Sequence, residues 1–342
     1  MAVYTEVGDD DLVGFLAAYG VGDLVSFKGI AEGVENSNYL IQTTADQFIL
    51  TLYEKRVAEH DLPFFLGLME HLALADFVCP TPVRRQDGAQ LAQLAGRPAA
   101  LVTFLDGVWP RKPTTAHCHA VGRAMAELHL AARSFTLTRA NGLGPDAWPG
   151  LFARFRDAAD TIHPGLSATI ATELKALDAL WPEAGALPTG VIHADLFPDN
   201  IFFRDGALSG VIDFYFACQD VLAYDIAIAL NAWCFEPNIS VNLTKGRALL
   251  AGYESVRPLD PQEVAALPVL CRGAALRFLL TRAFDWLNTP DTALVKPHDP
   301  LPYLRRLWVH QQIESARDYG RDDGFSAGAE RAGDAGKGGS GA

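Results

Sequence analysis

The chain has 342 residues, of which 49% are hydrophobic and 20% are charged, and its formal net charge is −13. This length suits about two domains of ~150 residues each, and the composition is that of an ordinary soluble globular protein. The negative charge argues against a nucleic-acid or anionic-membrane surface, because both need clustered Lys and Arg side chains. A nucleotide ligand stays possible, since backbone N–H groups and a metal ion can hold phosphates.

The cysteines and the N-terminus indicate an intracellular chain. No C-x-x-C motif occurs, and the five cysteines have apolar neighbours, so we expect buried free thiols rather than disulfides or a zinc site. The first residues, MAVYTEVGDDD, lack the basic and apolar segments of a signal peptide. No apolar run approaches the ~18 residues of a membrane span. We therefore expect a cytoplasmic protein without a transmembrane helix.

The first third of the chain is rich in predicted strands. A helix is expected over 9–20, because acidic residues precede it and a glycine ends it. Apolar residues at helical spacing predict a second helix over 57–74. Strands are predicted at 24–30, 38–43, 47–54, 89–95 and 99–105, with a tight turn at 44–46.

The rest of the chain is dominated by predicted helices. They lie at 114–132 and at about 148–160, 167–181, 221–234, 241–254, 261–286 and 301–317. The only strand-like material in this half is 189–213. The pattern predicts an α+β protein with a strand-rich lobe (1–105), a hinge near Leu105–Gly107 and a larger helical lobe (106–320). The Gly/Ala-rich tail (321–342) is expected to be disordered.

Two polar islands interrupt the apolar residues of this strand-like region. In VIHADLFPDNIFF the polar residues include His193, Asp195 and Asn200, and SGVIDFYFA holds Asp213. Burying such groups unpaired costs on the order of 2–7 kcal/mol each. The spacing H-x-D-x-x-x-x-N, a hairpin and then an apolar-apolar-D-F sequence suits phosphoryl transfer. There one carboxylate accepts a hydroxyl proton, and an amide oxygen and a second carboxylate hold Mg²⁺ on the ATP phosphates. The alternative is a polar turn between two strands.

The two islands resemble the aminoglycoside/choline phosphotransferase branch of the protein-kinase-like superfamily, in which the middle residue of H-x-D is small. The resemblance implies a protein-kinase-like two-lobed fold, with Asp195 as the catalytic base and His193 bracing its loop. It implies Asn200 and Asp213 as the magnesium ligands. Asp225, in AYDIAIAL, would anchor the backbone of the catalytic loop, or else is a charge at a helix N-terminus.

The same resemblance places the nucleotide in the first lobe. Gly29 and Gly33 lie between two predicted strands, where kinase-like folds close a loop over the phosphates, although a glycine pair in a hairpin is usually only a turn. The segment VTFLDG would bind adenine through the backbone between Thr103 and Leu105.

One position departs from the family pattern. The strand residue that is a phosphate-contacting lysine in kinase-like folds aligns with Thr51. Lys55 lies on the same strand face, because strand faces alternate, and either Lys55 or Lys28 could substitute. Alternatively, Lys55 is a solvated charge at a strand end and no lysine serves. Glu59 is the nearest candidate for the usual acidic partner.

Further segments narrow the acceptor. The sequences EGVENSNYLI, FILTLYEKR, LPFFLGLMEHLA, VIDFYFACQD and ALRFLLTRAFDWL resemble those of bacterial homoserine kinases of this superfamily, over roughly residues 1–318. This resemblance implies transfer of the ATP γ-phosphoryl group to the hydroxyl of L-homoserine in threonine biosynthesis, with ATP and Mg²⁺.

A zwitterionic acceptor needs a cation for its carboxylate. Arg277 and Arg282 lie in an otherwise apolar helix and suit that role, although such arginines are more often structural. Tyr215 and Trp233 are candidates for lining the pocket, with buried packing as the alternative.

Three rival functions are weighed against this one. The nearest is a kinase for another amino alcohol, such as choline, an aminoglycoside or hydroxylysine. The second is an inactive nucleotide-binding protein, which Thr51 favours and the intact Asp195, Asn200 and Asp213 oppose. The third is a metal-dependent hydrolase using His193 and Asp195, which no additional His or Cys cluster supports. The sequence does not indicate an oligomeric state.

Overall fold

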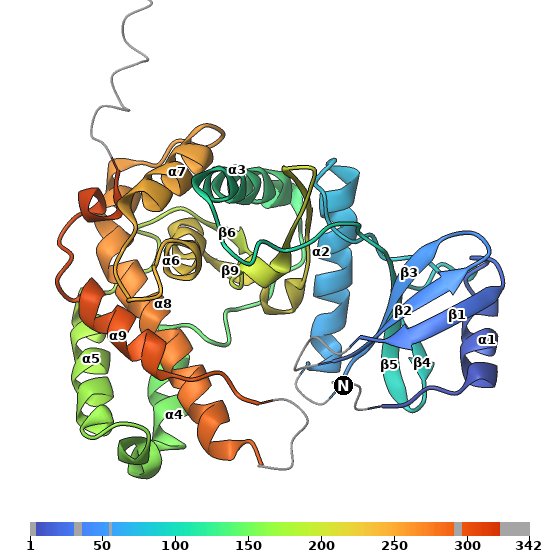
Figure 1. The fold of residues 1–342 in the computed structure, drawn as a ribbon, viewed down its shortest axis with the longest axis horizontal. Coiled ribbons are helices and arrows are strands. Elements are labelled where there is room, and N and C mark those ends of the chain that lie inside the picture. Colours follow the sequence, from blue (N-terminus) through green and yellow to red (C-terminus); the bar gives the residue numbers. More distant parts are fainter. Residues whose placement is uncertain (1–4, 31–35, 55–56, 291–295, 322–342) are drawn as a thin grey trace, which may run out of the picture.

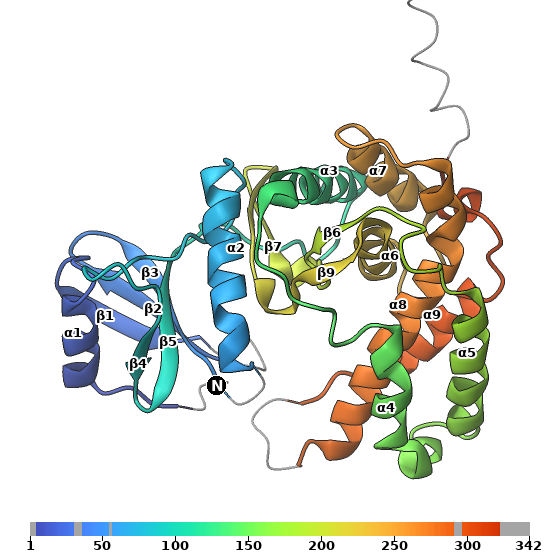
Figure 2. The ribbon, with the colours of Figure 1, turned by 180° about the vertical axis from the view of Figure 1, so that it is seen from behind.

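The computed structural model describes residues 5–30, 36–54, 57–290 and 296–321. An antiparallel sheet with two helices forms one end of the molecule, the N-terminal lobe, and a larger, mostly helical C-terminal lobe forms the other (Figures 1 and 2). The predicted α+β architecture is therefore confirmed. The boundary at residues 105 and 106 stays a prediction, and the tail from residue 322 lies outside the described residues.

The N-terminal lobe is a five-stranded sheet in the order β1-β2-β3-β5-β4 with every neighbouring pair antiparallel. Alternate residues of β2 are buried, as expected when one face of a strand is covered. Leu12 and Leu16 of the first helix pack with one side of the sheet, whereas the second helix joins the core of the C-terminal lobe. The elements are α1 (Asp9–Ala17), β1 (Leu24–Gly29), β2 (Ser37–Thr43), β3 (Gln47–Leu52), α2 (Leu62–Leu74), β4 (Ala92–Leu94) and β5 (Arg97–Thr103).

The C-terminal lobe contains α3 (Thr115–Ala131), α4 (Trp148–Ala153), α5 (Leu166–Leu180), α6 (Leu222–Trp233), α7 (Leu243–Glu254), α8 (Pro261–Asn288) and α9 (Leu301–His310). The helices predicted over 148–160 and 301–317 are shorter than expected, because 3₁₀ turns follow α4 and α9. Helix α8 is long and apolar enough to cross a membrane. However, 67% of its most apolar window is buried inside the fold, as in the core helix of a soluble domain.

The described part of the C-terminal lobe contains four short strands. They are β6 (Thr189–Ile192), β7 (Ile201–Arg204), β8 (Ala207–Val211) and β9 (Cys218–Val221). The predicted hairpin is β7–β8, but the prediction that strands end at residue 213 was wrong, because β9 pairs antiparallel with β6. Four residues are too few to show a periodicity, and the partner strand is distant in sequence. All five cysteines are free and buried, as expected.

A fully buried histidine near the end of the described chain makes the stability of the fold sensitive to acid. His310 Nε2–H donates to Asn231 Oδ1 over 3.0 Å, because the Asn231 amide nitrogen already donates to two backbone carbonyls. Its Nδ1 accepts from the Tyr319 hydroxyl at 2.7 Å. Burial lowers the pKa of His310 to about 3. The ring is therefore neutral in the folded protein at neutral pH.

We expect the free energy of unfolding to fall as the pH drops below 6.5. The unfolded chain binds a proton on this ring near pH 6.5 and the folded chain only near pH 3, so His310 contributes its full stability above pH 6.5. It loses about 1.4 kcal/mol per pH unit between these values. Urea titrations at several pH values would measure the slope. The variant His310→Gln should be less stable at pH 7 but have a shallower slope, and an unchanged slope would contradict the assignment.

Candidate active site

A buried carboxylate binds the backbone of the residues that follow β6. Asp225, on α6, has no exposed surface and accepts the backbone N–H groups of His193 and Ala194 at 2.9 Å each. His129, on α3, donates to the same carboxylate over 3.1 Å. Burial alone would raise the pKa of Asp225, but the hydrogen bonds that it accepts from His129 and from the backbone outweigh burial and lower the pKa. The carboxylate therefore stays ionised and fixes the entry of the loop.

Ala194, between His193 and Asp195, adopts a strained backbone conformation. Ala194 has φ +63°, in the left-handed region that costs a side-chain-bearing residue about 1–3 kcal/mol. Both of its peptide groups are held: Asp225 accepts its N–H, and Arg277 Nη1 donates to its carbonyl. Trp233 Nε1 likewise donates to the carbonyl of Leu196 over 2.7 Å. These contacts compensate the strain and direct the backbone on either side of Asp195.

His193 joins the two polar islands. Its Nε2–H donates to the carbonyl of Ile212 over 3.0 Å, and its Nδ1 accepts the N–H of Asp195 at 3.3 Å, which assigns the tautomer. Burial lowers the pKa of the imidazole, in keeping with a neutral ring. The backbone of Asp195 is thus tied to the residue before Asp213.

The β7–β8 hairpin brings Asn200 and Asp213 together. Asn200 precedes β7, and its carbonyl accepts the N–H of Ile212 at 2.9 Å. Its side-chain Nδ2 donates to the carbonyl and to Oδ2 of Asp195, over 2.8 and 3.1 Å. Asp213 follows at φ +64°. Asp195, Asn200 and Asp213 are therefore on adjoining backbone segments.

The donor set at this hairpin fits a hard divalent cation. Asn200 Nδ2 faces Asp195, and its Oδ1 accepts no hydrogen bond from the described residues. No cluster of three or more His, Cys, Asp or Glu side chains suited to a metal occurs among those residues. Mg²⁺ is commonly bound by one or two protein oxygens together with substrate phosphates, so the amide of Asn200 and the carboxylate of Asp213 would suffice.

The predicted hinge lies against this hairpin. Thr103 ends β5, and the Leu105 N–H and carbonyl form no hydrogen bond within the described ranges. Gly107 has φ +155°, and a Cβ there would clash with Oγ of Ser209. The connection between the lobes therefore passes close to β8 and leaves backbone groups of Leu105 for a ligand.

The structure describes only some of the other residues that were predicted to bind the nucleotide. Gly29 ends β1 opposite Tyr39, whereas Gly33 and Lys55 lie outside the described residues. Lys28 and Glu59 are exposed.

Thr51 occupies a buried, uncharged position. It is 2% exposed and donates to Oδ1 of Asn38 over 2.8 Å. Next to it, the hydroxyls of Tyr53 and Tyr215 lie 3.2 Å apart, and burial raises the pKa of Tyr215 to about 12. The Tyr215 hydroxyl therefore contacts the N-terminal lobe. The residue expected to line an acceptor pocket connects the two lobes.

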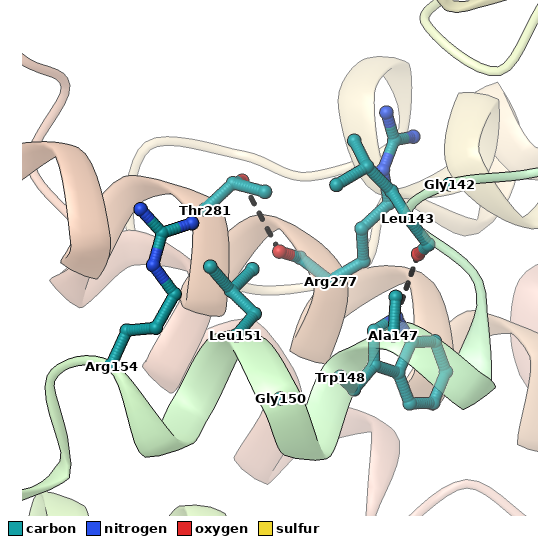
Figure 3. A pocket seen from close by; sticks show the side chains of 9 residues that line it. All are labelled: Gly142, Leu143, Ala147, Trp148, Gly150, Leu151, Arg154, Arg277 and Thr281. Atoms are coloured by element: carbon teal, nitrogen blue, oxygen red, sulfur yellow. Dashed lines mark hydrogen bonds between the residues drawn. The ribbon is translucent and has the colours of Figure 1, made fainter.

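A cavity of about 270 Å³ lies between α4 and α8 (Figure 3). It is lined by Gly142, Leu143, Ala147, Trp148, Gly150, Leu151, Arg154, Arg277 and Thr281. Arg277 is 2% exposed and extends from this cavity to the carbonyl of Ala194, while stacking on Phe278 at 4.4 Å. This contact makes Arg277 a support of the loop before Asp195. Arg282, one residue beyond Thr281, instead lies over the ring of Tyr303.

Two residues that support the site, His129 and Trp233, have roles that the sequence did not predict. His129 was not selected, although a histidine within an otherwise apolar helix face is a signal for a buried polar partner. Trp233 was expected to line the pocket, but its ring N–H donates a hydrogen bond to the carbonyl of Leu196. Both contacts join residues far apart in the sequence, so no local pattern reports them.

Comparisons with known proteins find similar sequences along most of the chain. The model of the phosphotransferase enzyme family matches residues 26–259. A homoserine kinase of Acidiphilium cryptum (strain JF-5) is 63% identical over 320 residues, covering 94% of this chain and all of the relative.

Solved structures extend the likeness to the fold. A microcompartment-associated aminopropanol kinase aligns with a TM-score of 0.70 at 22% identity, covering 92% of this chain and 99% of the other. An amicoumacin kinase in complex with AMP-PNP and Ca²⁺ aligns with a TM-score of 0.67 at 14% identity, covering 90% and 95% of the two chains. The predicted kinase-like two-lobed fold is thus confirmed.

Proposed function

Because the chain belongs to the phosphotransferase enzyme family, and within it to the homoserine kinases, we propose that it transfers the γ-phosphoryl group of ATP to the hydroxyl of L-homoserine. The product is O-phospho-L-homoserine, an intermediate on the route to threonine. The observation that carries this proposal is 63% identity along 94% of the chain, with the two polar islands assembled at one point of the fold. A cytoplasmic location and a requirement for Mg²⁺ are parts of the proposal.

In this proposal Asp195 is the catalytic base. Its carboxylate accepts the proton of the acceptor hydroxyl as that oxygen forms a bond to the γ-phosphorus. The bond to the β–γ bridging oxygen breaks, and ADP leaves with its electron pair. Asn200 orients the carboxylate through Nδ2, and His193 and Asp225 position the backbone. Positioning of this kind lowers the barrier because little reorganisation remains for the reaction.

Asn200 and Asp213 are assigned as the magnesium ligands. Bound there, Mg²⁺ would neutralise charge on the β- and γ-phosphate oxygens. Leu105 and Thr103 would bind adenine through the backbone, and the segment that contains Gly29 and Gly33 would cover the phosphates. Lys55 is the candidate for the phosphate-contacting cation. Support for this half of the site comes from the family membership and from the backbone groups of Leu105, which form no hydrogen bond with the other described residues.

A panel of hydroxyl compounds tests the proposed acceptor. We expect L-homoserine to be phosphorylated far faster than choline or kanamycin, because a site that pairs both charged ends of a small amino acid leaves buried groups unmatched when one end is absent. Such mismatches reach factors of roughly 10⁴. Homoserine lactone should be inert and L-serine poor, since its hydroxyl is one methylene too short to reach Asp195. The measurement is coupled ADP release with phosphorus NMR of the product.

The rival functions predict different results in the same panel. Faster turnover of choline or an aminoglycoside would overturn homoserine as the acceptor and leave the kinase assignment standing. Failure to release ADP with every compound would favour an inactive nucleotide-binding protein. Phosphate release without a phosphorylated product would favour a hydrolase.

A further inference from the structure

Two arginines from different helices meet at one tyrosine. The guanidinium carbons of Arg282, on α8, and Arg306, on α9, lie 4.5 and 4.6 Å from the ring centroid of Tyr303. Arg306 also lies over Phe235 at 5.2 Å. Stacking on aromatic faces is favourable for a guanidinium and holds its plane in a fixed orientation. The two cations are therefore close to one another and held in place.

Neither cation is neutralised inside the part of the chain that the structure describes. There, Arg282 and Arg306 form no ion pair and donate no hydrogen bond. Nε of Arg306 and the hydroxyl of the fully buried Tyr303 are both enclosed, and neither has a hydrogen-bond partner among the described residues. Buried polar groups in proteins are paired in the large majority of cases, so these donors call for an acceptor. Arg272, on the same helix as Arg282, is by contrast paired with Glu173, with 2.9 Å between its Nε and Oε1 of Glu173.

The cluster lies beside the catalytic loop. Phe197, two residues after Asp195, packs on Phe278 with ring centroids 4.9 Å apart, and Phe278 packs on Tyr303 at 5.1 Å. Burial lowers the pKa of Arg282 and Arg306 lowers it further, whereas the carboxylates of Asp195 and Asp199 act in the opposite direction. Asp195 and Arg306 are thus both within electrostatic reach of Arg282.

We propose that Arg282 and Arg306, held by Tyr303, bind the carboxylate of the amino-acid acceptor beside Asp195. This inference rests on the proposed function and names the residues that select an amino acid over an amino alcohol. A carboxylate has two oxygens and can accept from the guanidinium groups of both arginines at once, and such charge-assisted bonds are the strong ones. Arg277 is the weaker candidate, because its Nη1 is already committed to the carbonyl of Ala194.

The test compares L-homoserine with 3-amino-1-propanol, which is the same molecule without the carboxylate. In Arg282→Gln and Arg306→Gln, kcat/KM for homoserine should fall about 10²-fold or more, as for truncating one partner of a buried charge pair. For 3-amino-1-propanol, kcat/KM should change by less than about threefold, because this substrate has no carboxylate for the arginines to bind. The ratio of kcat/KM for the two substrates therefore separates a loss of carboxylate binding from a general loss of activity. Arg306→Lys keeps the charge without the fork, so it should lose less. The matched control is Arg305→Gln, the exposed neighbour on α9, which should change neither value.

Each outcome decides one question. If the wild-type enzyme prefers homoserine and both glutamine variants keep that preference, this inference is wrong while the proposed function stands. If kcat/KM falls equally for both substrates in well-folded variants, the arginines are structural and the inference is also wrong. If the wild-type protein does not phosphorylate homoserine at all, the proposed function fails first. Thermal unfolding shows whether each variant is folded. If a glutamine variant does not fold, the two substrates are compared in Arg306→Lys instead.

Discussion

Asp195→Asn is expected to lower kcat by about 10²–10⁴ while leaving the affinity for ATP nearly unchanged. A positioned general base contributes this much to a proton transfer, and an amide cannot accept the hydroxyl proton. The surrounding contacts should survive, because the oxygen of the introduced amide can still accept from Nδ2 of Asn200 and the backbone bonds to His193 and Asn200 do not involve the replaced side chain. The loss should therefore be in the chemical step.

Single-turnover kinetics and ATP titration would measure the two effects separately. The matched control is Asp205→Asn, in the exposed turn between β7 and β8, where φ is +51° and Asn is as well tolerated as Asp. That variant should retain wild-type kcat. Turnover of Asp195→Asn within a factor of two of wild type would remove Asp195 from the role of base.

The parts of the site that could be predicted are those that are local in sequence. His193, Asp195 and Asn200 lie within eight residues, and a short hairpin brings Asp213 next to them, so one motif and its spacing foretell their proximity. The same holds for β2 and β3, whose turn is closed by the bond from the Thr43 N–H to the Asp46 carbonyl. Local turns and alternating burial leave a direct record in the sequence.

Contacts between distant segments leave no such record. Ala194 is left-handed, and the two contacts that hold its N–H and its carbonyl come from Asp225 on α6 and Arg277 on α8. The stacking of Arg282 and Arg306 on Tyr303 depends on how α8 crosses α9. A single arginine in an apolar helix is compatible with an ion pair or a ligand site. Only its three-dimensional neighbours distinguish Arg277, which supports the loop, from Arg282, which is unpaired among the described residues.

Asp213→Ala is expected to abolish the Mg²⁺-dependent part of ATP binding. A hard cation needs an anionic oxygen at this position, and Asn200 alone would leave one neutral ligand. Calorimetric titrations with ATP in Mg²⁺ and in EDTA would show a clear gain in affinity with Mg²⁺ for the wild-type protein. The variant should show the same affinity in both buffers. Binding is the readout, so the result does not depend on turnover.

The backbone at this residue must be separated from its charge. Asp213 has φ +64°, where Ala is strained and Asn is better tolerated. Asp213→Asn therefore keeps the conformation and removes the anionic oxygen. If both variants lose the effect of Mg²⁺ and melt near the wild-type temperature, the carboxylate is the ligand. If only Asp213→Ala loses it, the backbone turn is what the site requires. A wild-type response to Mg²⁺ in both variants would exclude Asp213 from metal binding and leave Asn200 without its proposed partner.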